Sequence, residues 1–318
     1  MSLLQESFQM LNDKQSMRLF NVMLASSQAF VTTGDYERIR PTFKREDCWI
    51  IEDSKRKTMS LLQESFQMLN DKQSMRLFNV MLASSQAFGG VAVFLVAIWM
   101  GGYEDGFAWS DDPERQFHYH PTFMTMGLIF LYGEALLVYR VFRNERKRFS
   151  KLLHLTLHTM VLIFMIIALK AVWDSHDYHR KDGELDPIPN LYSFHSWVGI
   201  TVVTTYCIQY VSGFTTFFFP GLSIPMRQFV MPFHQAFGLG IFCFVAITAS
   251  MGISERAAWH HTCWTQGKEL CGEQAISNLL GLSILMYCAS VVIIVLNPRW
   301  RRRPLPEEES LHQLTSTD

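Results

Sequence analysis

Apolar residues in this chain gather into six long blocks that are separated by polar loops. Each block is close to or above the roughly 20 apolar residues that cross the ~30 Å hydrocarbon core of a bilayer. The blocks cover residues 79–101, 121–142, 154–173, 193–214, 234–254 and 276–297. Because only helices and closed barrels span a bilayer, the pattern predicts an all-α membrane protein with six transmembrane helices.

The charges of the loops predict how these helices are oriented. The loop after the second block and the tail after the sixth are rich in Lys and Arg, whereas the first and third loops carry mostly acids. Loops with an excess of Lys and Arg stay in the cytosol. We therefore predict an integral, multi-pass protein whose N- and C-termini are both cytosolic. The pattern does not distinguish a vesicle or lysosomal membrane from the plasma membrane.

A perfect repeat stands before the membrane blocks. Residues 1–30 recur letter for letter at residues 59–88. Structural repeats diverge around a shared pattern, so this identity indicates a recent duplication or a gene-model error. Only the second copy runs on into an apolar block long enough to span a membrane. We expect an extra N-terminal segment outside the fold at 1–58, a cytosolic N-terminus at 59–78, the membrane domain at 79–298 and a cytosolic tail at 299–318.

Composition and motifs exclude several soluble functions. The chain has 28 Lys and Arg against 29 Asp and Glu, so it lacks the positive excess typical of nucleic-acid binding. It contains no P-loop, no GxGxxG, no HExxH and no CxxC pair with zinc spacing. Two of its six cysteines, Cys263 and Cys271, fall in a predicted non-cytosolic loop. They could form a disulfide in an oxidising lumen, and two free thiols are the alternative.

Histidines lie at the ends of four of the blocks. His120 and His195 begin the second and fourth blocks, on the predicted outer side, and His154 and His234 begin the third and fifth, on the cytosolic side. His118 lies before the second block, and we expect it in the loop. Ionisable residues at membrane depth usually mark function.

The histidines therefore sort into two facing pairs, one in each leaflet. Two neutral imidazoles from facing helices are a suitable axial ligand set for a haem iron, and helix bundles commonly hold such cofactors. His154 and His158 are one helical turn apart, so spacing alone does not decide which of them belongs to the cytosolic pair. The alternative for any single histidine is that its ring only reaches the membrane interface.

Several motifs resemble one known family. FHYHPTFM, GEALLVYRVFRNE, SKLLHLTLH, LYSFHSWVG, RQFVMPFHQAFG and SNLLGL are similar, in order and spacing, to the signatures of the cytochrome b561 family. The resemblance implies a six-helix fold whose inner four-helix bundle holds two b-type haems. It pairs His120 with His195 at the outer haem and His154 with His234 at the cytosolic haem, and it favours His154 over His158.

The resemblance also implies further site residues. Other haem contacts would be Arg140 and Lys147 on the cytosolic side, with Asn190, Leu191, Tyr192, Ser193 and Glu255 on the outer side. Cytosolic ascorbate would bind at Lys147, Lys151 and Arg227. On the acceptor side the matching positions are His176 and Asn278, although the third loop is several residues longer than is usual in the family.

The function implied is that of a transmembrane ascorbate-dependent oxidoreductase. It would pass single electrons from cytosolic ascorbate through two haem b groups to a non-cytosolic acceptor, either monodehydroascorbate or ferric iron. The expected partners are the lipid bilayer, these small molecules and, by resemblance, a second copy in a homodimer, with no nucleic acid. The main alternative is a haem-free transporter of divalent metal ions or protons that uses the intramembrane histidines. A purely structural membrane scaffold is the third reading.

Overall fold

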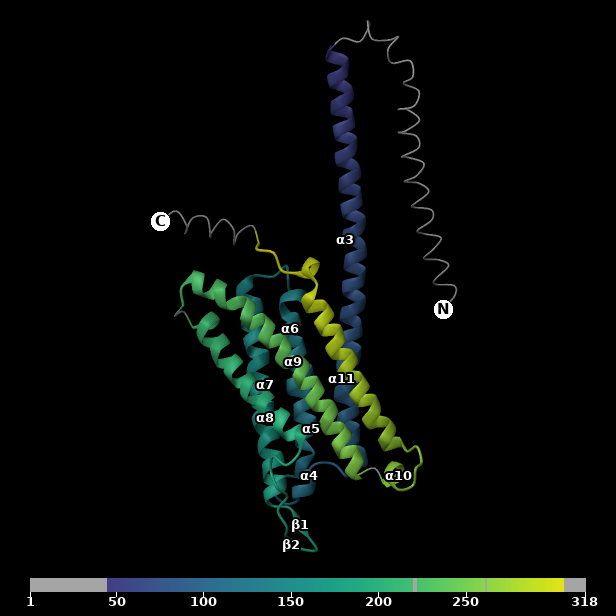
Figure 1. Cartoon of the computed structure of the whole chain (residues 1–318), viewed down its shortest axis with the longest axis vertical. Helices are drawn as coiled ribbons and strands as arrows, with labels where there is room; N and C mark the ends of the chain where they lie inside the picture. Colours follow the sequence, from purple (N-terminus) through teal and green to yellow (C-terminus); the bar gives the residue numbers. More distant parts are fainter. Residues whose placement is uncertain (1–44, 220–221, 261, 306–318) are drawn as a thin grey trace. The chain divides into compact units, whose positions relative to one another are not determined.

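The computed structural model describes residues 45–219, 222–260 and 262–305 of the chain (Figure 1). It divides into two compact units, Met1–Lys72 and Gln73–Asp318, which are described separately. The described part of the first unit is the beginning of helix α3 (Arg45–Ile98), which continues into the second unit. All other described elements belong to the second unit.

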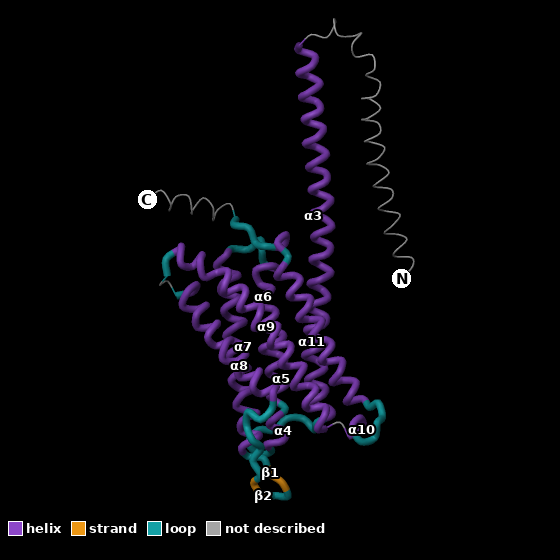
Figure 2. The backbone as a smooth tube through the Cα atoms, in the orientation of Figure 1, coloured by secondary structure: helices purple, strands orange, loops and turns teal. Residues whose placement is uncertain are grey.

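The second unit consists mainly of long helices that run beside one another (Figure 2). Besides the end of α3, they are α7 (Lys147–Asp177), α8 (Phe194–Gly213), α9 (Ile224–His260) and α11 (Gly272–Leu296). One further long segment is built from α4 (Pro113–Phe117), α5 (Tyr119–Met124), a π-helical stretch (Thr125–Leu131) and α6 (Tyr132–Val141). Short elements are the π-helical turns Trp99–Tyr103 and Phe214–Phe218, α10 (Thr262–Thr265) and the 3₁₀ turn Pro298–Trp300.

Within the described ranges, five helical segments are long and apolar enough to cross a membrane. They are Gln67–Tyr103, Pro113–Val141, Lys147–Asp177, Ile224–His260 and Gly272–Leu296. The fourth predicted block forms α8, whose 20 residues include His195, Gln209 and three threonines, and which is not among these five segments. The prediction of an all-helical membrane protein is therefore confirmed, with five spans identified by length and composition.

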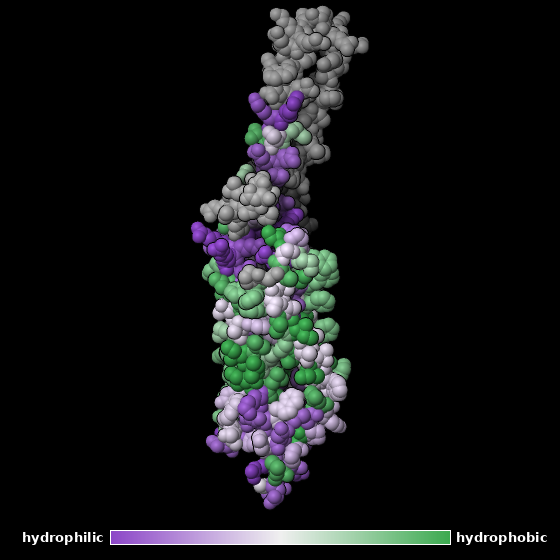
Figure 3. Space-filling model, turned by 90° about the vertical axis from the view of Figure 1, so that its left-hand side faces the viewer, coloured by the Kyte–Doolittle hydropathy of each residue, from purple (hydrophilic) through white to green (hydrophobic). Residues whose placement is uncertain are grey.

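The surface of the second unit carries a hydrophobic band. Figure 3 shows hydrophobic side chains gathered across the middle of one face, with hydrophilic residues beyond both edges of the band. Large apolar side chains such as Phe94, Ile166, Phe237 and Leu282 are exposed on different helices. Soluble proteins rarely expose so much contiguous apolar surface, so the band fits a lipid environment.

Local sequence signals fix where the helices start. The Ser193 hydroxyl accepts a hydrogen bond from the backbone N–H of Ser196 at 3.2 Å, which caps the N-terminus of α8. Asp112 caps α4 in the same way through the N–H of Arg115, and Pro113 occupies the first helical position. The cap at Ser193 places His195 in the first turn of α8.

The third loop contains a small hairpin that the sequence analysis did not predict. Strand β1 (Arg180–Lys181) pairs antiparallel with β2 (Glu184–Leu185). The turn residues Asp182 and Gly183 have φ values of 54° and 86°. An Asp-Gly pair with both φ values positive is typical of the two-residue type I′ turn, which explains why the loop folds back here.

Aromatic residues fill the centre of the second unit. α5 and α6 pack against α7, α8 packs against α9, and α11 packs against α6 and α9. The buried ring of Tyr132 lies 5.4 Å from that of Tyr206 and 5.5 Å from that of Phe242. Its hydroxyl donates to the carbonyl of Gly238 at 2.8 Å, so its polar end is satisfied.

A second polar contact joins three helices inside the apolar region. The Tyr287 hydroxyl of α11 lies 2.9 Å from the carbonyl oxygen of Phe130 and 3.0 Å from a carboxyl oxygen of Glu134 on α6. Gln86 of α3 donates to the same carboxyl oxygen at 2.8 Å. Tyr287 can approach this closely because it packs directly over Gly133.

We predict that Gly133→Ala destabilises the protein. A Cβ at this position would lie 2.3 Å from the Tyr287 hydroxyl oxygen, and the ring cannot withdraw without losing its hydrogen bonds. Overpacking of this kind costs about 1–3 kcal/mol. The thermal unfolding temperature in detergent should fall for Gly133→Ala. It should not fall for the control Gly240→Ala, whose Cβ would have no neighbour within 4 Å. Equal unfolding temperatures for the two variants would contradict the packing described here.

Candidate functional site

The pair predicted to lie on the outer side, called the outer pair below, consists of His120 at the start of α5 and His195 in the first turn of α8. Their ring centroids are 6.3 Å apart and the rings are nearly perpendicular, at 89°. The Nδ1 atom of His120 lies 3.3 Å from the carbonyl oxygen of Ala168, and that of His195 lies 2.9 Å from the carbonyl oxygen of Thr248. A carbonyl oxygen can only accept, so each Nδ1 donates its proton and each Nε2 keeps a free lone pair.

The pair predicted to lie on the cytosolic side, called the cytosolic pair below, consists of His154 on α7 and His234 on α9. Their ring centroids are 6.4 Å apart, with the rings at 72°. The Nδ1 atom of His154 lies 2.8 Å from the carbonyl oxygen of Ala135. That of His234 lies 3.0 Å from the side-chain amide nitrogen of Gln209. The second pair thus repeats the spacing of the first.

Both spacings fit a shared metal ion between the rings. An imidazole nitrogen lies about 1 Å from its ring centre and bonds a metal at about 2 Å, so two rings on opposite sides of one iron have centres about 6 Å apart. Hydrogen bonds from Nδ1 to a fixed acceptor are also the usual way in which a metal-ligating histidine is oriented. The two pairs therefore match the donor set of a haem with two axial histidines.

Two glycines make room for these rings. A Cβ added at Gly252 on α9 would lie 2.7 Å from Cε1 of His195 on α8, and one added at Gly213 on α8 would lie 2.8 Å from Cε1 of His234 on α9. Real Cβ atoms do not approach this closely, so each histidine packs where only glycine leaves space. The contact is reciprocal, because each helix presents one histidine to a glycine of the other.

A cavity of about 620 Å³ opens beside the outer pair. Its size is within the range of about 300–1,000 Å³ that is usual for cofactor and ligand sites. The cavity is lined by His120 and His195 and by six residues that the sequence analysis assigned to the outer side: His176, Asn190, Leu191, Tyr192, Ser193 and Glu255. The structure thus brings the predicted outer contacts together around one hollow.

His158 occupies a different environment from His154. Its ring packs edge-on against that of His154, with centroids 4.5 Å apart, and lies 4.9 Å from the ring of Tyr132. Its Nδ1 is 3.2 Å from the Tyr206 hydroxyl. Of the two histidines, His154 matches the outer pair, because its Nδ1 faces a backbone carbonyl and its ring lies 6.4 Å from the ring of its partner.

Positive charge gathers close to the cytosolic pair. Lys147, Arg148 and Arg227 lie near enough to Lys151 for their charges to repel its ammonium group. The Nε atom of Arg227 is buried without a hydrogen-bond partner among the described residues. Such a cluster is suited to an anion, because a carboxylate or enolate would satisfy several of these donors at once.

Phe217 joins this cluster to the cytosolic pair. Lys151 donates from Nζ to the carbonyl oxygen of Phe217 at 2.9 Å, and the Phe217 ring lies 5.1 Å from the ring of His234. Arg140, in contrast, donates to the carbonyl oxygens of Val295 and Asn297 at the end of α11. The structure therefore brings Lys147, Lys151 and Arg227 together. The Arg140 side chain instead binds the C-terminal end of α11.

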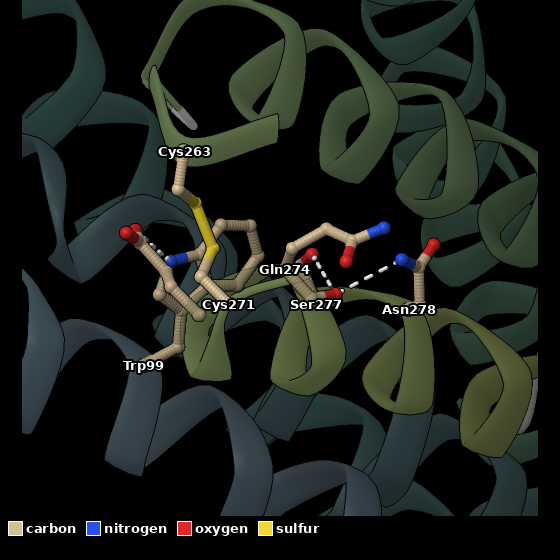
Figure 4. Close-up of a disulfide and its surroundings, with 7 residues drawn as sticks. Trp99, Cys263, Cys271, Gln274, Ser277 and Asn278 are labelled. Atoms are coloured by element: carbon tan, nitrogen blue, oxygen red, sulfur yellow. Dashed lines mark hydrogen bonds between the residues drawn. A yellow bond between two sulfur atoms is a disulfide. The ribbon is translucent and has the colours of Figure 1, made fainter. Parts of the chain in front are cut away.

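On the predicted acceptor side, His176 is held at the rim of the cavity. Its Nδ1 lies 2.9 Å from the Asn190 side-chain oxygen, and Asn190 donates to Asp177 at 2.8 Å. Asn278 is exposed on α11, where it donates to the carbonyl of Gln274 (Figure 4), and it is not among the described residues that line the cavity. Of the two predicted acceptor-side residues, His176 thus lines the cavity and Asn278 lies on the exposed surface of α11.

The two cysteines of the last loop predicted to be non-cytosolic are joined. Cys263 and Cys271 form a disulfide that closes the loop before α11 (Figure 4). Beside it, the indole of Trp99 donates to Glu273 at 3.0 Å. Within the described ranges, no three His, Cys, Asp or Glu side chains lie close enough together to hold a metal ion.

His118 lies outside a helix, as expected, but the sequence analysis did not predict that it is buried. The residues before the second block fold into α4, so His118 lies between two helices and only 1% of its surface is exposed. Its Nδ1 donates to the carbonyl oxygen of Gly106, and its neighbour Glu104 forms an ion pair with Arg256. Burial alone would raise the pKa of the Glu104 carboxyl, but the hydrogen bonds and positive charge of Arg256 outweigh burial and hold that pKa below its usual value.

The sequence analysis also missed Gly213 and Gly252, although a signal was present. Gly213 follows His195 by 18 residues, and Gly252 follows His234 by 18 residues. At 3.6 residues per turn this spacing is about five full turns, so each glycine lies on the same helix face as its histidine. The equal spacing in two adjacent antiparallel helices predicts the reciprocal contact.

Comparison with known proteins shows which family this architecture belongs to. The profile of eukaryotic cytochrome b561 matches residues 119–260. A homologue of the transmembrane ascorbate-dependent reductase from Caenorhabditis elegans is 59% identical over 261 residues, which are 81% of this chain and 98% of that protein. The transmembrane ascorbate-dependent reductase of Homo sapiens is 41% identical over 232 residues, 72% of this chain and 87% of that protein.

A third relative is the plasma membrane ascorbate-dependent reductase of Xenopus laevis. It is 36% identical over 242 residues, which are 76% of this chain and 81% of that protein. These relatives confirm the resemblance found in the sequence motifs. The chain belongs to the cytochrome b561 family.

Proposed function

We propose that this protein moves single electrons across a membrane, from ascorbate on the cytosolic side to an acceptor on the other side. The observation that carries the proposal is the two matched histidine pairs, with 6.3 Å and 6.4 Å between ring centroids, whose four members come from four different helical segments. Two haem b groups, when bound between these rings, would supply the one-electron carriers. The reductases among its relatives bear names that support this activity.

Each of four helical segments supplies one of the proposed axial ligands. His120 comes from α5, His154 from α7, His195 from α8 and His234 from α9. We propose that these segments form an inner four-helix bundle, with α3 and α11 outside it. α8 would then be the sixth membrane-spanning helix, because it packs beside α9 and carries a ligand for the same bundle.

The cytosolic donor site would be the cluster of Lys147, Lys151 and Arg227. Ascorbate is an anion at neutral pH, and these positively charged side chains would bind it. The bound anion would lie close to His234, because Phe217 contacts both Lys151 and the ring of His234. Ascorbate that gives up one electron also loses a proton, so a base must lie nearby. Lysine or histidine at this mouth could accept that proton.

The acceptor side would be the cavity beside the outer pair. Its rim residue His176 is oriented by Asn190 and faces the same hollow as Glu255. Monodehydroascorbate would take up one electron and one proton there to give ascorbate, and ferric iron would take up one electron to give ferrous iron. Either acceptor is compatible with the residues present.

The remaining assignments follow from the topology. We propose that both ends of the membrane domain are cytosolic and that the protein resides in a vesicle or lysosomal membrane or in the plasma membrane. Residues 1–58 would lie outside the functional domain. In support, 81% of this chain is enough to match 98% of the C. elegans relative. A homodimer remains part of the proposal by family resemblance.

Reconstituted vesicles test the function directly. With ascorbate on the cytosolic face and a membrane-impermeant ferric chelate on the other, the wild type should reduce the chelate many times faster than empty vesicles do. His154→Ala should abolish this transfer because one of the two cytosolic ligands is lost. If wild-type vesicles match empty ones but take up divalent cations, the transporter alternative would replace the proposal.

The donor site makes a separate prediction. Lys151→Ala and Arg227→Ala should each raise the KM for ascorbate by at least about tenfold, because a hydrogen bond to a charged group contributes about 1.5–3 kcal/mol and 1.4 kcal/mol corresponds to a factor of ten. The matched control is Lys170→Ala, a lysine of the same helix that pairs with Asp174 at 2.8 Å. Steady-state rates at varied ascorbate measure the effect. An unchanged KM in both cluster variants would remove ascorbate from this site.

A further inference from the structure

The four proposed axial histidines do not have equivalent hydrogen-bond partners. The Nδ1 atoms of His120, His154 and His195 face backbone carbonyls. The helices fix the positions of these carbonyls, and a carbonyl oxygen is always an acceptor, whichever side chain its residue carries. The Nδ1 atom of His234 faces a side chain, Gln209 of α8. One of the two cytosolic ligands is therefore oriented by a group that can be replaced or can rotate.

The Gln209 amide is held tightly against α9. Its nitrogen lies 2.7 Å from the carbonyl oxygen of His234 and 3.0 Å from Nδ1 of the same residue. A Cβ added at Gly238, one turn further along α9, would lie 3.4 Å from this nitrogen. Gly213, one turn after Gln209 on α8, packs against the same imidazole. The amide and the ring thus fit together in one small space.

An amide differs from a carbonyl because it offers both a donor and an acceptor. With its nitrogen toward Nδ1, Gln209 donates and the His234 proton must reside on Nε2. With the amide rotated so that its oxygen accepts the proton of Nδ1 while its nitrogen keeps the hydrogen bond to the His234 carbonyl oxygen, Nε2 is left free to bind a metal. The orientation of one amide is thereby linked to the tautomer of His234.

We propose that Gln209 is a positioning residue that selects the metal-binding tautomer of His234 and sets the reduction potential of the cytosolic haem independently of the outer one. The inference rests on the proposed function, because it needs a haem between His154 and His234. A stronger acceptor at Nδ1 makes the imidazole a better electron donor to iron, which stabilises the ferric state and lowers the potential. Loss of the acceptor has the opposite effect.

Two substitutions at one position separate tuning from mere packing. Gln209→Glu places a carboxylate at Nδ1 and should lower the potential of the cytosolic haem. Gln209→Met keeps the length of the side chain without a strong acceptor and should raise it. A residue that only filled space would shift the potential in the same direction, or not at all, in both variants.

The measurement is a spectroelectrochemical titration of the purified protein that resolves the two haems by their absorption bands, together with electron paramagnetic resonance of the ferric state. The cytosolic haem should shift in opposite directions in the two variants, while the outer haem keeps its wild-type potential. The matched control is Thr205→Val, an exposed residue of the same helix whose hydroxyl bonds, within the described residues, only to carbonyls of α8, and no shift is expected.

The outcomes distinguish this inference from the proposed function. Two haems in each variant, with unchanged potentials or with equal shifts at both haems, would overturn the role of Gln209 and leave the electron-transfer proposal intact. A wild-type protein without haem would overturn both. Opposite shifts confined to one haem would support the inference.

Discussion

The close contact between α8 and α9 is the constraint on which both histidine pairs depend. Each helix carries a histidine and, 18 residues later, a glycine, and the antiparallel arrangement sets the histidine of one helix against the glycine of the other. Eighteen residues of helix rise about 27 Å, close to the ~30 Å hydrocarbon core of a bilayer. A single helix–helix interface therefore fixes one site near each side of the membrane.

The two ends of this interface differ in what surrounds them. At the end proposed to be cytosolic, Lys151 and Arg227 supply positive charge, and Phe217 contacts both Lys151 and the ring of His234. At the outer end, a large cavity lies beside His120 and His195, with His176 at its rim. A similar pair of proposed ligands is thus combined with a proposed anion site at one end and a large cavity at the other, so the two ends differ in the reactants that they can admit.

The sequence predicted most of this arrangement, and the exceptions have physical causes. Apolar blocks and loop charges are local properties, so the helices and the two histidine pairs could be inferred from spacing. The hairpin at 180–185, the burial of His118 and the contacts of Arg140 depend on how distant segments meet, which periodicity does not encode. Gln209 was missed because a single glutamine in an apolar helix carries no signal until its partner on α9 is known.

The central claim is that α8 and α9 together create two separate sites for haem. It is tested most directly by counting haem per chain and recording the ascorbate-reduced spectrum of the wild type, Gly213→Val and Gly252→Val. The wild type should hold two b-type haems that ascorbate reduces. Gly252→Val should lose the haem that His120→Ala loses, and Gly213→Val the haem that His154→Ala loses. A colourless wild type, or glycine variants that keep both haems unchanged, would contradict the claim.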